Sequence, residues 1–438
     1  MIRFTCPVYP SIRVHRGDNT YIEFHDGETL VNWSDAAILR GLDNVIEGDV
    51  ARDSKGRPLQ SYPLAHDVVS WYSMVLGVGD GFGNSAERMI VALEKRGVKI
   101  IVDPAIPTVG ETFISNVRNR RFEQGKVRIA YSPPGYNFLP KYKGQVSLGF
   151  CMWEDSLLPP PWNQYLGAVD TLVAPSKFCV ELLRERCEEL GYDTPVSLVP
   201  LGVQTDFYTY QRRSRHPTQV FTILHSCTSL WDGRKGVDDA VAAFRAAFTD
   251  GENVKLVIRA RIGQVQTFGD ERIDVRISML TEQQKLDGLF EAHCLLYPSY
   301  GEGFGLVPLE AIATGLPVIC SENTGMLDYI DLVTIPIECD PEPSKIVIAG
   351  YETKGTWQRP RQEELVSALR DMYARYRTHV AKAAHAAKAV RAWSYDATAS
   401  ALLAAIEVAK ERHRQVNDVP GLNGQAAGEL LTTSGPQS

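Results

Sequence analysis

Short apolar runs alternate with amphipathic stretches along most of the chain. The first complete unit consists of an apolar run, a glycine-rich turn, an amphipathic stretch and a second apolar run, at 70–78, 79–84, 85–97 and 98–104. Apolar runs bounded by turn residues predict buried strands, and the periodic stretch between them predicts a helix capped by Ser85. A strand, a helix and a second strand of this kind place both strands parallel in one sheet. The pattern therefore predicts an α/β fold.

This alternation forms two blocks. It continues over 127–203 and restarts near residue 220, after a polar, basic and turn-rich stretch at 211–219. A stretch of that composition is typical of an interdomain linker. The sequence thus predicts two domains, each built on a parallel sheet.

The two ends of the chain differ from these blocks. Apolar and polar positions alternate around Asp26 and Gly27, which predicts a β-hairpin with these residues as its turn. The last residues are small, polar and aperiodic, which predicts disorder. The predicted division is an extension of unknown role, two domains, a final helix and a tail, at 1–68, 69–210, 211–392, 393–414 and 415–438.

Composition limits the partners and the chemistry. The chain has 438 residues and a net charge of −7, which argues against a surface-wide site for nucleic acid or an anionic membrane. Its 8 cysteines include no C-x-x-C pair and its 9 histidines have no metal-binding spacing, so we expect neither a disulfide framework nor a metal site. The start lacks a signal-peptide core and no long apolar run follows, so we expect a cytoplasmic protein without a transmembrane segment.

Two glutamates mark the stretch with the clearest chemistry. Glu302 lies in a glycine-rich loop, and Glu310 lies on a helix expected to begin near Leu306. Their separation of roughly 10 Å matches a diphosphate, whose phosphates suit glycine-loop amides and a helix N-terminus. One carboxylate can then hold ribose hydroxyls and the other the hydroxyls of a sugar. Two solvated glutamates would be the simpler interpretation, but the glycines and the strand–helix–strand context favour a ligand site.

The stretch PSYGEGFGLVPLEAIATGLPVICSENTG (298–325) resembles the E-x7-E signature of retaining glycosyltransferases of the GT-B fold, those of glycosyltransferase family 4. The resemblance implies that Glu302 contacts the donor sugar and that Glu310 contacts the ribose. The loop residues between them are further donor-binding candidates: Gly303, Phe304 and Gly305.

Other segments extend the resemblance over about residues 70 to 412. Residues 175–178 and 199–203 fill the family's P-S-x-F and V-P-x-G-V positions, although Gln204 stands where aspartate is common. The resemblance implies two Rossmann-like domains facing a cleft, the first for the acceptor and the second for the nucleotide sugar. It also implies that the final helix, 393–414, crosses back to the first domain.

An Arg-Lys-Gly triplet precedes a predicted helix in the second domain. There Arg234 and Lys235 can neutralise charge on a leaving diphosphate, although such a pair is often a solvated surface. Many relatives place the arginine several residues earlier, at Leu230 here, so Lys235 is the firmer candidate. Arg261 lies nearer than Arg259 to the carboxyl end of its strand, and is the better of two further phosphate candidates.

The first domain offers candidates for both substrates. Gly79 and Gly81 are expected to face the donor diphosphate; a dinucleotide-binding motif is the alternative, but the G-x-G-x-x-G spacing fails. Glu154 and Asp155 end an apolar strand, where open α/β sheets place ligands. One of them can orient or deprotonate the acceptor hydroxyl or support an oxocarbenium-like transition state, and helix capping is the alternative role.

The sequence predicts a retaining, metal-independent hexosyl- or pentosyltransferase that needs no cofactor beyond its nucleoside diphosphate sugar donor. The acceptor stays open among a glycan, a lipid-linked sugar, a protein and a modified base, and the oligomeric state is not predicted. Two alternatives remain: a non-catalytic or partner-dependent nucleotide-sugar binder, and a glycosyltransferase acting on modified nucleic-acid bases.

Overall fold

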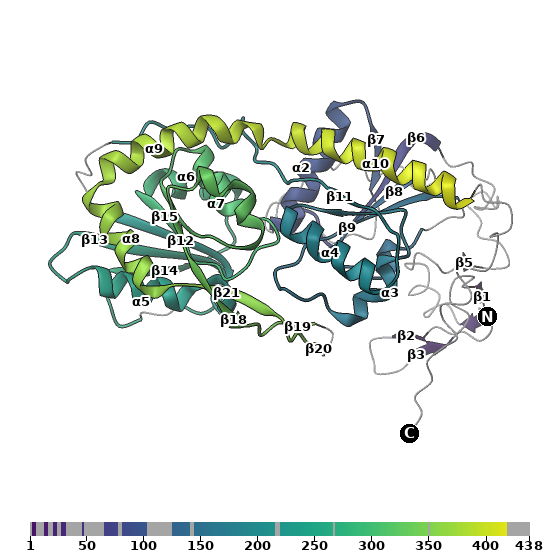
Figure 1. Cartoon of the computed structure of the whole chain (residues 1–438), viewed down its shortest axis with the longest axis horizontal. Helices are drawn as coiled ribbons and strands as arrows, with labels where there is room; N and C mark the ends of the chain where they lie inside the picture. Colours follow the sequence, from purple (N-terminus) through teal and green to yellow (C-terminus); the bar gives the residue numbers. More distant parts are fainter. Residues whose placement is uncertain are drawn as a thin grey trace, which may run out of the picture.

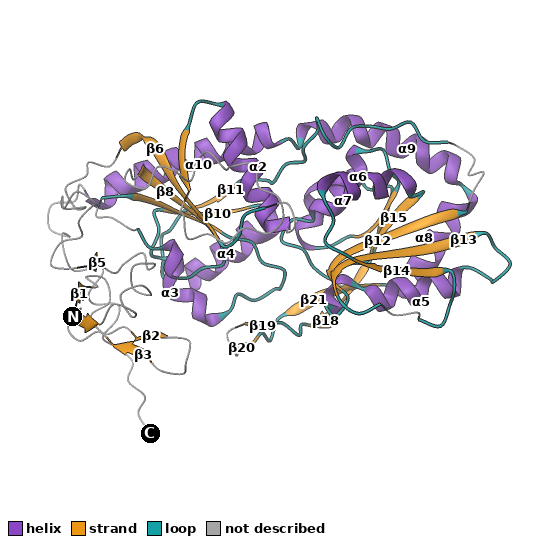
Figure 2. Cartoon of the chain, turned by 180° about the vertical axis from the view of Figure 1, so that it is seen from behind, coloured by secondary structure: helices purple, strands orange, loops and turns teal. Residues whose placement is uncertain are grey.

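Two parallel sheets of six strands, one in each half of the chain, form the framework (Figures 1 and 2). The computed structural model describes five short strands before residue 48 and then residues 65–77, 81–102, 125–140, 144–214, 220–265, 268–348 and 351–417. The α/β class and the two-domain GT-B architecture predicted from the sequence are both present.

The first sheet has the strand order β11-β10-β9-β8-β6-β7. Its chain order reverses between β6 and β8, and ligands of open parallel sheets bind outside the carboxyl ends of the strands at such a point. The strands are β6 (Ala65–Ser73), β7 (Lys99–Val102), β8 (Gly125–Tyr131), β9 (Val146–Phe150), β10 (Thr171–Ala174) and β11 (Val196–Leu198). Its helices are α2 (Gly81–Lys95), α3 (Asn163–Leu166) and α4 (Lys177–Glu189), with short 3₁₀ turns η3 (Tyr136–Phe138) and η4 (Pro160–Trp162).

Two boundaries in this domain differ from the prediction. The strand expected at 70–78 lies at 65–73, and α2 begins at Gly81 rather than after Ser85. The Ser85 hydroxyl is buried and contacts the Tyr131 hydroxyl at 2.8 Å. Ser85 therefore packs the helix against the sheet, and residues 81–84, the described part of the expected glycine-rich turn, form the first turn of the helix.

The second sheet has the order β14-β13-β12-β15-β16-β17 and reverses between β12 and β15. Apolar residues of α5 and α8 cover one face, and those of α6 and α7 cover the other. The strands are β12 (Phe221–Ser229), β13 (Val254–Ile262), β14 (Ile273–Ile277), β15 (Cys294–Tyr297), β16 (Val318–Ser321) and β17 (Ile335–Ile337). The helices are η5 (Gly233–Lys235), α5 (Val237–Ala247), α6 (Glu282–Glu291), α7 (Leu306–Ala313), η6 (Thr324–Leu332), α8 (Gln362–Ala374), α9 (Tyr376–Ala389) and η7 (Val390–Ala392).

A long hairpin leaves the second domain after β17. Its stem is the antiparallel pair β18 (Cys339–Pro343) and β21 (Thr356–Pro360), and its tip pairs β19 (Val347–Ile348) with β20 (Tyr351–Glu352). Figure 1 shows the hairpin extending from the second sheet toward the first domain, beneath the gap between the two. We call residues 339–360 the strap.

The chain joins the domains at two adjacent crossings. Val203 and Ser394 form a parallel bridge, and a Cβ on Gly202 would lie 2.3 Å from the Tyr395 nitrogen, so only glycine fits there. Helix α10 (Tyr395–Asn417) then packs on α2, β9 and β10 of the first domain. In both views α9 and α10 run one after the other along one side of the molecule (Figures 1 and 2).

The N-terminal extension contains short strands, but one predicted pairing is wrong. β3 (Tyr21–Glu23) pairs with β2 (Arg13–His15) and not with the strand that follows it. The other strands, β1 (Ile2–Thr5), β4 (Glu28–Val31) and β5 (Ile46–Glu47), form a sheet in the order β4-β1-β5. The expected turn at Asp26 and Gly27 lies outside the described residues, among which no helix has the length and apolarity to cross a membrane.

Candidate active site

A cavity of about 440 Å³ lies between the domains, at the carboxyl ends of both sheets. The strand order predicts a ligand there, because each sheet has its reversal point at this edge. Ten of the twelve site residues expected from the sequence line this cavity: Gly81, Glu154, Arg234, Lys235, Arg261, Glu302, Gly303, Phe304, Gly305 and Glu310. Of the other two, Gly79 lies outside the described residues and Asp155 lies elsewhere.

Glu302 lines the cavity from the loop between β15 and α7. Its Oε1 accepts hydrogen bonds from Lys235 Nζ at 2.5 Å, Ser299 Oγ at 2.7 Å and Tyr297 Oη at 2.9 Å. Burial opposes ionisation, but the charges of Lys235 and Arg234 outweigh it and lower the pKa of Glu302 to about 2. The carboxylate is therefore ionised, and these three donors hold it through Oε1.

The loop after β12 brings two cations to this carboxylate. The Asp232 side chain accepts a hydrogen bond from the Arg234 nitrogen at 3.2 Å and so caps the short helix η5. Gly236 ends that helix with φ +64°, and a Cβ there would lie 2.1 Å from the Pro298 carbonyl oxygen. Glycine is thus required where the β12 and β15 loops touch.

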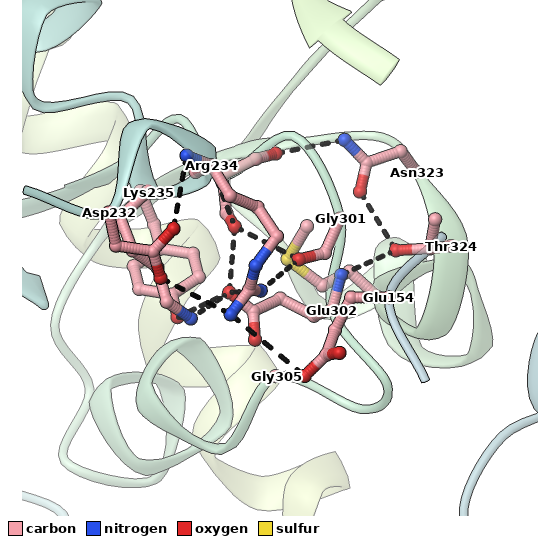
Figure 3. Close-up of polar contacts among 12 residues, drawn as sticks. Glu154, Asp232, Arg234, Lys235, Gly301, Glu302, Gly305, Asn323 and Thr324 are labelled. Atoms are coloured by element: carbon pink, nitrogen blue, oxygen red, sulfur yellow. Dashed lines mark hydrogen bonds and ion pairs between the residues drawn. The ribbon is translucent and has the colours of Figure 1, made fainter. Parts of the chain in front are cut away.

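Arg234 connects these loops to the first domain. Its guanidinium donates to the Gly301 carbonyl and lies 3.4 Å from Glu302 and 3.9 Å from Glu154 (Figure 3). Burial raises the pKa of Glu154, and the charge of Arg234 acts against this rise. Carboxylates from both domains thus lie within 4 Å of the Arg234 guanidinium.

Glu310 lies at a second end of the cavity, on α7. The helix begins at Leu306 as predicted, and no side chain caps it at Gly305, so its first backbone N–H groups can bind an anion. Burial and the nearby Glu282 carboxylate raise the pKa of Glu310 to about 8. Tyr208 donates to Glu282 at 3.0 Å and thereby supports this acidic pair.

The cavity also contains both arginines of β13. Gly288 leaves room for the Arg259 guanidinium, which donates to the Gln284 carbonyl at 3.2 Å. Arg261 lies nearer the strand end and lines the same cavity. Ser278 and Lys285 complete this part of the wall, where α6 begins.

The first-domain wall is aromatic and carries one carboxylate. The Phe82 and Tyr131 rings stack at 4.0 Å, and Met152 lies beside them in the cavity lining. Glu154 is the acidic residue on this wall. Asp155 is fully buried and accepts a hydrogen bond from Thr353 of the strap at 2.6 Å. Of the two acids that the sequence could not distinguish, Glu154 thus lines the cavity and Asp155 contacts the strap.

Sequence reasoning missed several residues that support the charged groups. Tyr297 and Ser299 flank Pro298 at the carboxyl end of β15, and Asp232 lies two residues before Arg234. Both positions could have been found from their place after the ends of strands. Glu282 and Tyr208 carry no such signal. Among the described residues, no group of three or more His, Cys, Asp and Glu side chains could hold a metal ion.

A family model described as "Family 4 Glycosyltransferase in conflict systems" matches residues 178–402, just over half of the chain. The α-1,3/1,6-mannosyltransferase ALG2 of Homo sapiens is 34% identical over 89 residues, 20% of each chain. The mouse ALG2 (Mus musculus) is 29% identical over 209 residues, 40% of this chain and 48% of the relative. This chain therefore spans at most about half the length of these curated relatives.

Solved structures share the architecture at low sequence identity. The trehalose-6-phosphate phosphatase N-terminal domain of Candida albicans has a TM-score of 0.56 at 11% identity, covering 79% of this chain and 97% of its own. The sucrose-phosphate synthase of Thermosynechococcus elongatus has a TM-score of 0.51 at 13% identity, covering 81% and 100%. These structures show the fold alone. The matches together do not favour a nucleotide-sugar binder without activity or an enzyme acting on nucleic-acid bases.

Proposed function

The chain belongs to the family 4 glycosyltransferases of conflict systems, and from this we propose that it transfers a hexosyl group from a nucleoside diphosphate sugar to an acceptor hydroxyl, with retention of anomeric configuration. The observation that carries the proposal is the charged cluster of Glu302, Lys235 and Arg234 in the cavity between the domains. A hexose is proposed because curated relatives include a mannosyltransferase and a probable sucrose-phosphate synthase of Thermosipho melanesiensis.

The donor would lie along the loop between β15 and α7. Its diphosphate would bind Lys235, Arg234 and the first N–H groups of α7. Glu310 would accept hydrogen bonds from ribose hydroxyls, and Glu302 would accept them from the sugar. The spacing of these two carboxylates fits a diphosphate between them, and the resemblance to the E-x7-E signature supports this direction.

In the reaction, the bond between the anomeric carbon and the phosphate oxygen breaks, and its electron pair stays on the diphosphate. The acceptor oxygen forms the new bond on the same face of the sugar, and its proton passes to Glu154. Lys235 and Arg234 stabilise the charge that grows on the leaving diphosphate. Because two buried cations and a helix N-terminus already supply this stabilisation, we propose that no metal ion is needed.

Nucleotide binding tests the donor site. UDP, GDP, ADP and their sugar conjugates are titrated while the thermal unfolding of the protein is followed, with Glu310→Ala beside the wild type. A ligand that binds only the folded state stabilises it by about 2.7 kcal/mol at a hundredfold excess over Kd. We expect one base to stabilise the wild type and Glu310→Ala to weaken that effect, while the exposed Glu322→Ala leaves it unchanged.

Retention and metal independence need a turnover assay. With the stabilising nucleotide sugar and a panel of acceptors, the anomeric configuration of the product is read by NMR, with and without a chelator. An inverted product or loss of turnover with chelator would overturn the corresponding part of the proposal. No stabilisation by any nucleotide would overturn the donor site itself.

A further inference from the structure

The strap is fixed at its base to the donor-binding side of the second domain. Asp239, buried in the first turn of α5, accepts hydrogen bonds from Tyr300 Oη and from Arg359 of β21, the latter at 2.8 Å. The Gln358 nitrogen donates to the Tyr300 carbonyl at 2.8 Å. The last strand of the strap, β21, is therefore attached to the loop that carries Glu302.

Further along, the strap is fixed to the first domain through Asp155. The carboxylate, 0% exposed, accepts hydrogen bonds from Ser344 Oγ and from Thr353 Oγ1. A Cβ on Gly355 would lie 1.6 Å from Asp155 Oδ1, so the strap backbone passes directly against the carboxylate. The Thr356 nitrogen donates to Ser156 Oγ at 2.8 Å and adds a second contact across the domains.

The strap contacts Asp155, which directly follows Glu154 in the chain. A Cβ on Gly301 would lie 2.5 Å from the Glu154 carbonyl oxygen, so the donor loop presses on the same peptide that Asp155 follows. The strap on one side and the donor loop on the other fix the backbone at Glu154. Its carboxylate then lies 3.9 Å from Arg234.

We propose that Asp155 is a positioning residue: it docks the strap of the nucleotide-binding domain onto the acceptor domain and thereby holds Glu154 in the cleft facing Arg234. The part concerning Glu154 rests on the proposed function. Asp155 itself does not touch the substrates, because its carboxylate is enclosed by the strap hydroxyls and the Leu157 nitrogen.

The decisive variant leaves Asp155 intact. Ser344→Ala with Thr353→Val removes both hydroxyl donors from the strap, and neither residue lines the cavity. Asp155→Asn is compared with it, and Lys345→Ala, exposed and adjacent to Ser344, is the matched control. Hydrogen–deuterium exchange of residues 339–360 reports docking, and the wild-type donor with its acceptor, or water where no acceptor is known, reports turnover.

We expect the double variant to raise exchange in the strap and to lower kcat, each about tenfold, because two hydrogen bonds to a buried carboxylate are lost. The donor KM and the exchange of both sheets stay unchanged, and Lys345→Ala behaves as the wild type. Combining the double variant with Asp155→Asn adds no further loss, since both changes act on the same contact.

Two results would overturn the proposal. If strap exchange were unchanged in all variants, Asp155 would not dock the strap. If Asp155→Asn abolished turnover while the double variant retained it, Asp155 would be catalytic. If the wild type turned over no donor, the proposed function would fail, whereas the exchange measurement would still decide whether Asp155 docks the strap.

Discussion

Glu302 is paired with both cations of the β12 loop, which determines what its substitution should do. Its Oε1 holds Lys235, and its ion pair with Arg234 measures 3.4 Å. In Glu302→Gln both cations lose a competing carboxylate, so we expect diphosphate binding to stay equal or become tighter. Turnover should fall by about 10²-fold or more, because a neutral amide cannot stabilise positive charge on the sugar.

Calorimetric Kd values and kcat for Glu302→Gln check whether nucleotide binding is kept while turnover is lost. The exposed Glu322→Gln, twenty positions along the chain, serves as the control and should match the wild type in both quantities. A parallel loss of nucleotide affinity and turnover would instead show that Glu302 mainly organises the phosphate site.

The raised pKa of Glu310 predicts how nucleotide-sugar affinity depends on pH. Burial and Glu282 raise its pKa to about 8, while Lys285 and Arg88 act in the opposite direction. Ribose hydroxyls donate best to the ionised carboxylate, so we expect the affinity for a nucleotide sugar to rise between pH 6 and about 8 and then level off. Calorimetric Kd values across this range check it, and Glu310→Gln should abolish the rise.

The same shift affects folding with the opposite sign. Since the folded pKa of Glu310 lies above the unfolded value, its contribution to stability is largest below the unfolded pKa and is lost as pH rises through about 8. Urea unfolding of the wild type and Glu310→Gln over this range provides an independent reading. Equal pH dependence in the two proteins would show that Glu310 does not titrate there.

At the scale of elements, the loops after β12 and β15 depend on one close contact. Gly236 has φ +64° and no space for a Cβ beside Pro298. Gly236→Ala should therefore lower the free energy of unfolding by about 2 kcal/mol and weaken nucleotide binding, because the two loops must separate.

Gly233 offers the matched control for this change. It lies in the same short helix, and a Cβ there would meet no atom within 4 Å. Gly233→Ala should leave both quantities within about 0.5 kcal/mol of the wild type. Equal effects of the two substitutions in urea unfolding would show that the contact at Pro298 does not matter.

Elements with strong local signals were predictable from the sequence. The start of α7 at Leu306 follows from the glycine loop before it, and Ser176 caps α4 as its P-S-x-F position suggests. The strap was not foreseen. Its strands contain Pro341, Pro343 and Pro360 and few apolar residues, so no alternating pattern marks them.

The same limit explains why Glu154 and Asp155 could not be told apart. Both follow an apolar strand, where either can reach a cleft. The partners of Asp155 are Ser344 and Thr353, 189 and 198 positions away, and only the folded chain brings them together. Local sequence predicts that such a strand end carries polar residues, but not which of two neighbours faces the ligand.

At the scale of the whole molecule, Arg213 fixes the polypeptide that leaves the first crossing. It donates to the carbonyls of Leu289, Ala292 and Gly315 at the ends of α6 and α7, at 2.8–3.0 Å. Leu289 lies in the last turn of α6, where a helix leaves its carbonyls without intrahelical partners, and Ala292 and Gly315 lie just beyond the ends of α6 and α7. Arg213→Ala should lower the free energy of unfolding by about 3 kcal/mol.

Arg212 is exposed and adjacent, so Arg212→Ala is the control and should change stability by less than about 0.5 kcal/mol. Urea unfolding followed by far-UV circular dichroism measures both variants. Similar stability of the two would mean that the linker docks through its backbone rather than through Arg213.

The carboxylates around Arg234 and Lys235 should also lower the affinity of the cleft for small inorganic anions. Asp232, Glu154 and Glu302 act as built-in counter-ions, so inorganic phosphate or sulfate gains little by approaching the two cations. Such an anion would also leave Glu302 buried without its partner, at a cost it cannot offset. The proposed nucleotide sugar donor would offset this cost, because its phosphates would bind the cations while its hydroxyls would donate to the released carboxylate. On the proposed function, the cleft thus favours a ligand that carries both phosphates and hydroxyls, and we expect small inorganic anions to compete poorly for it.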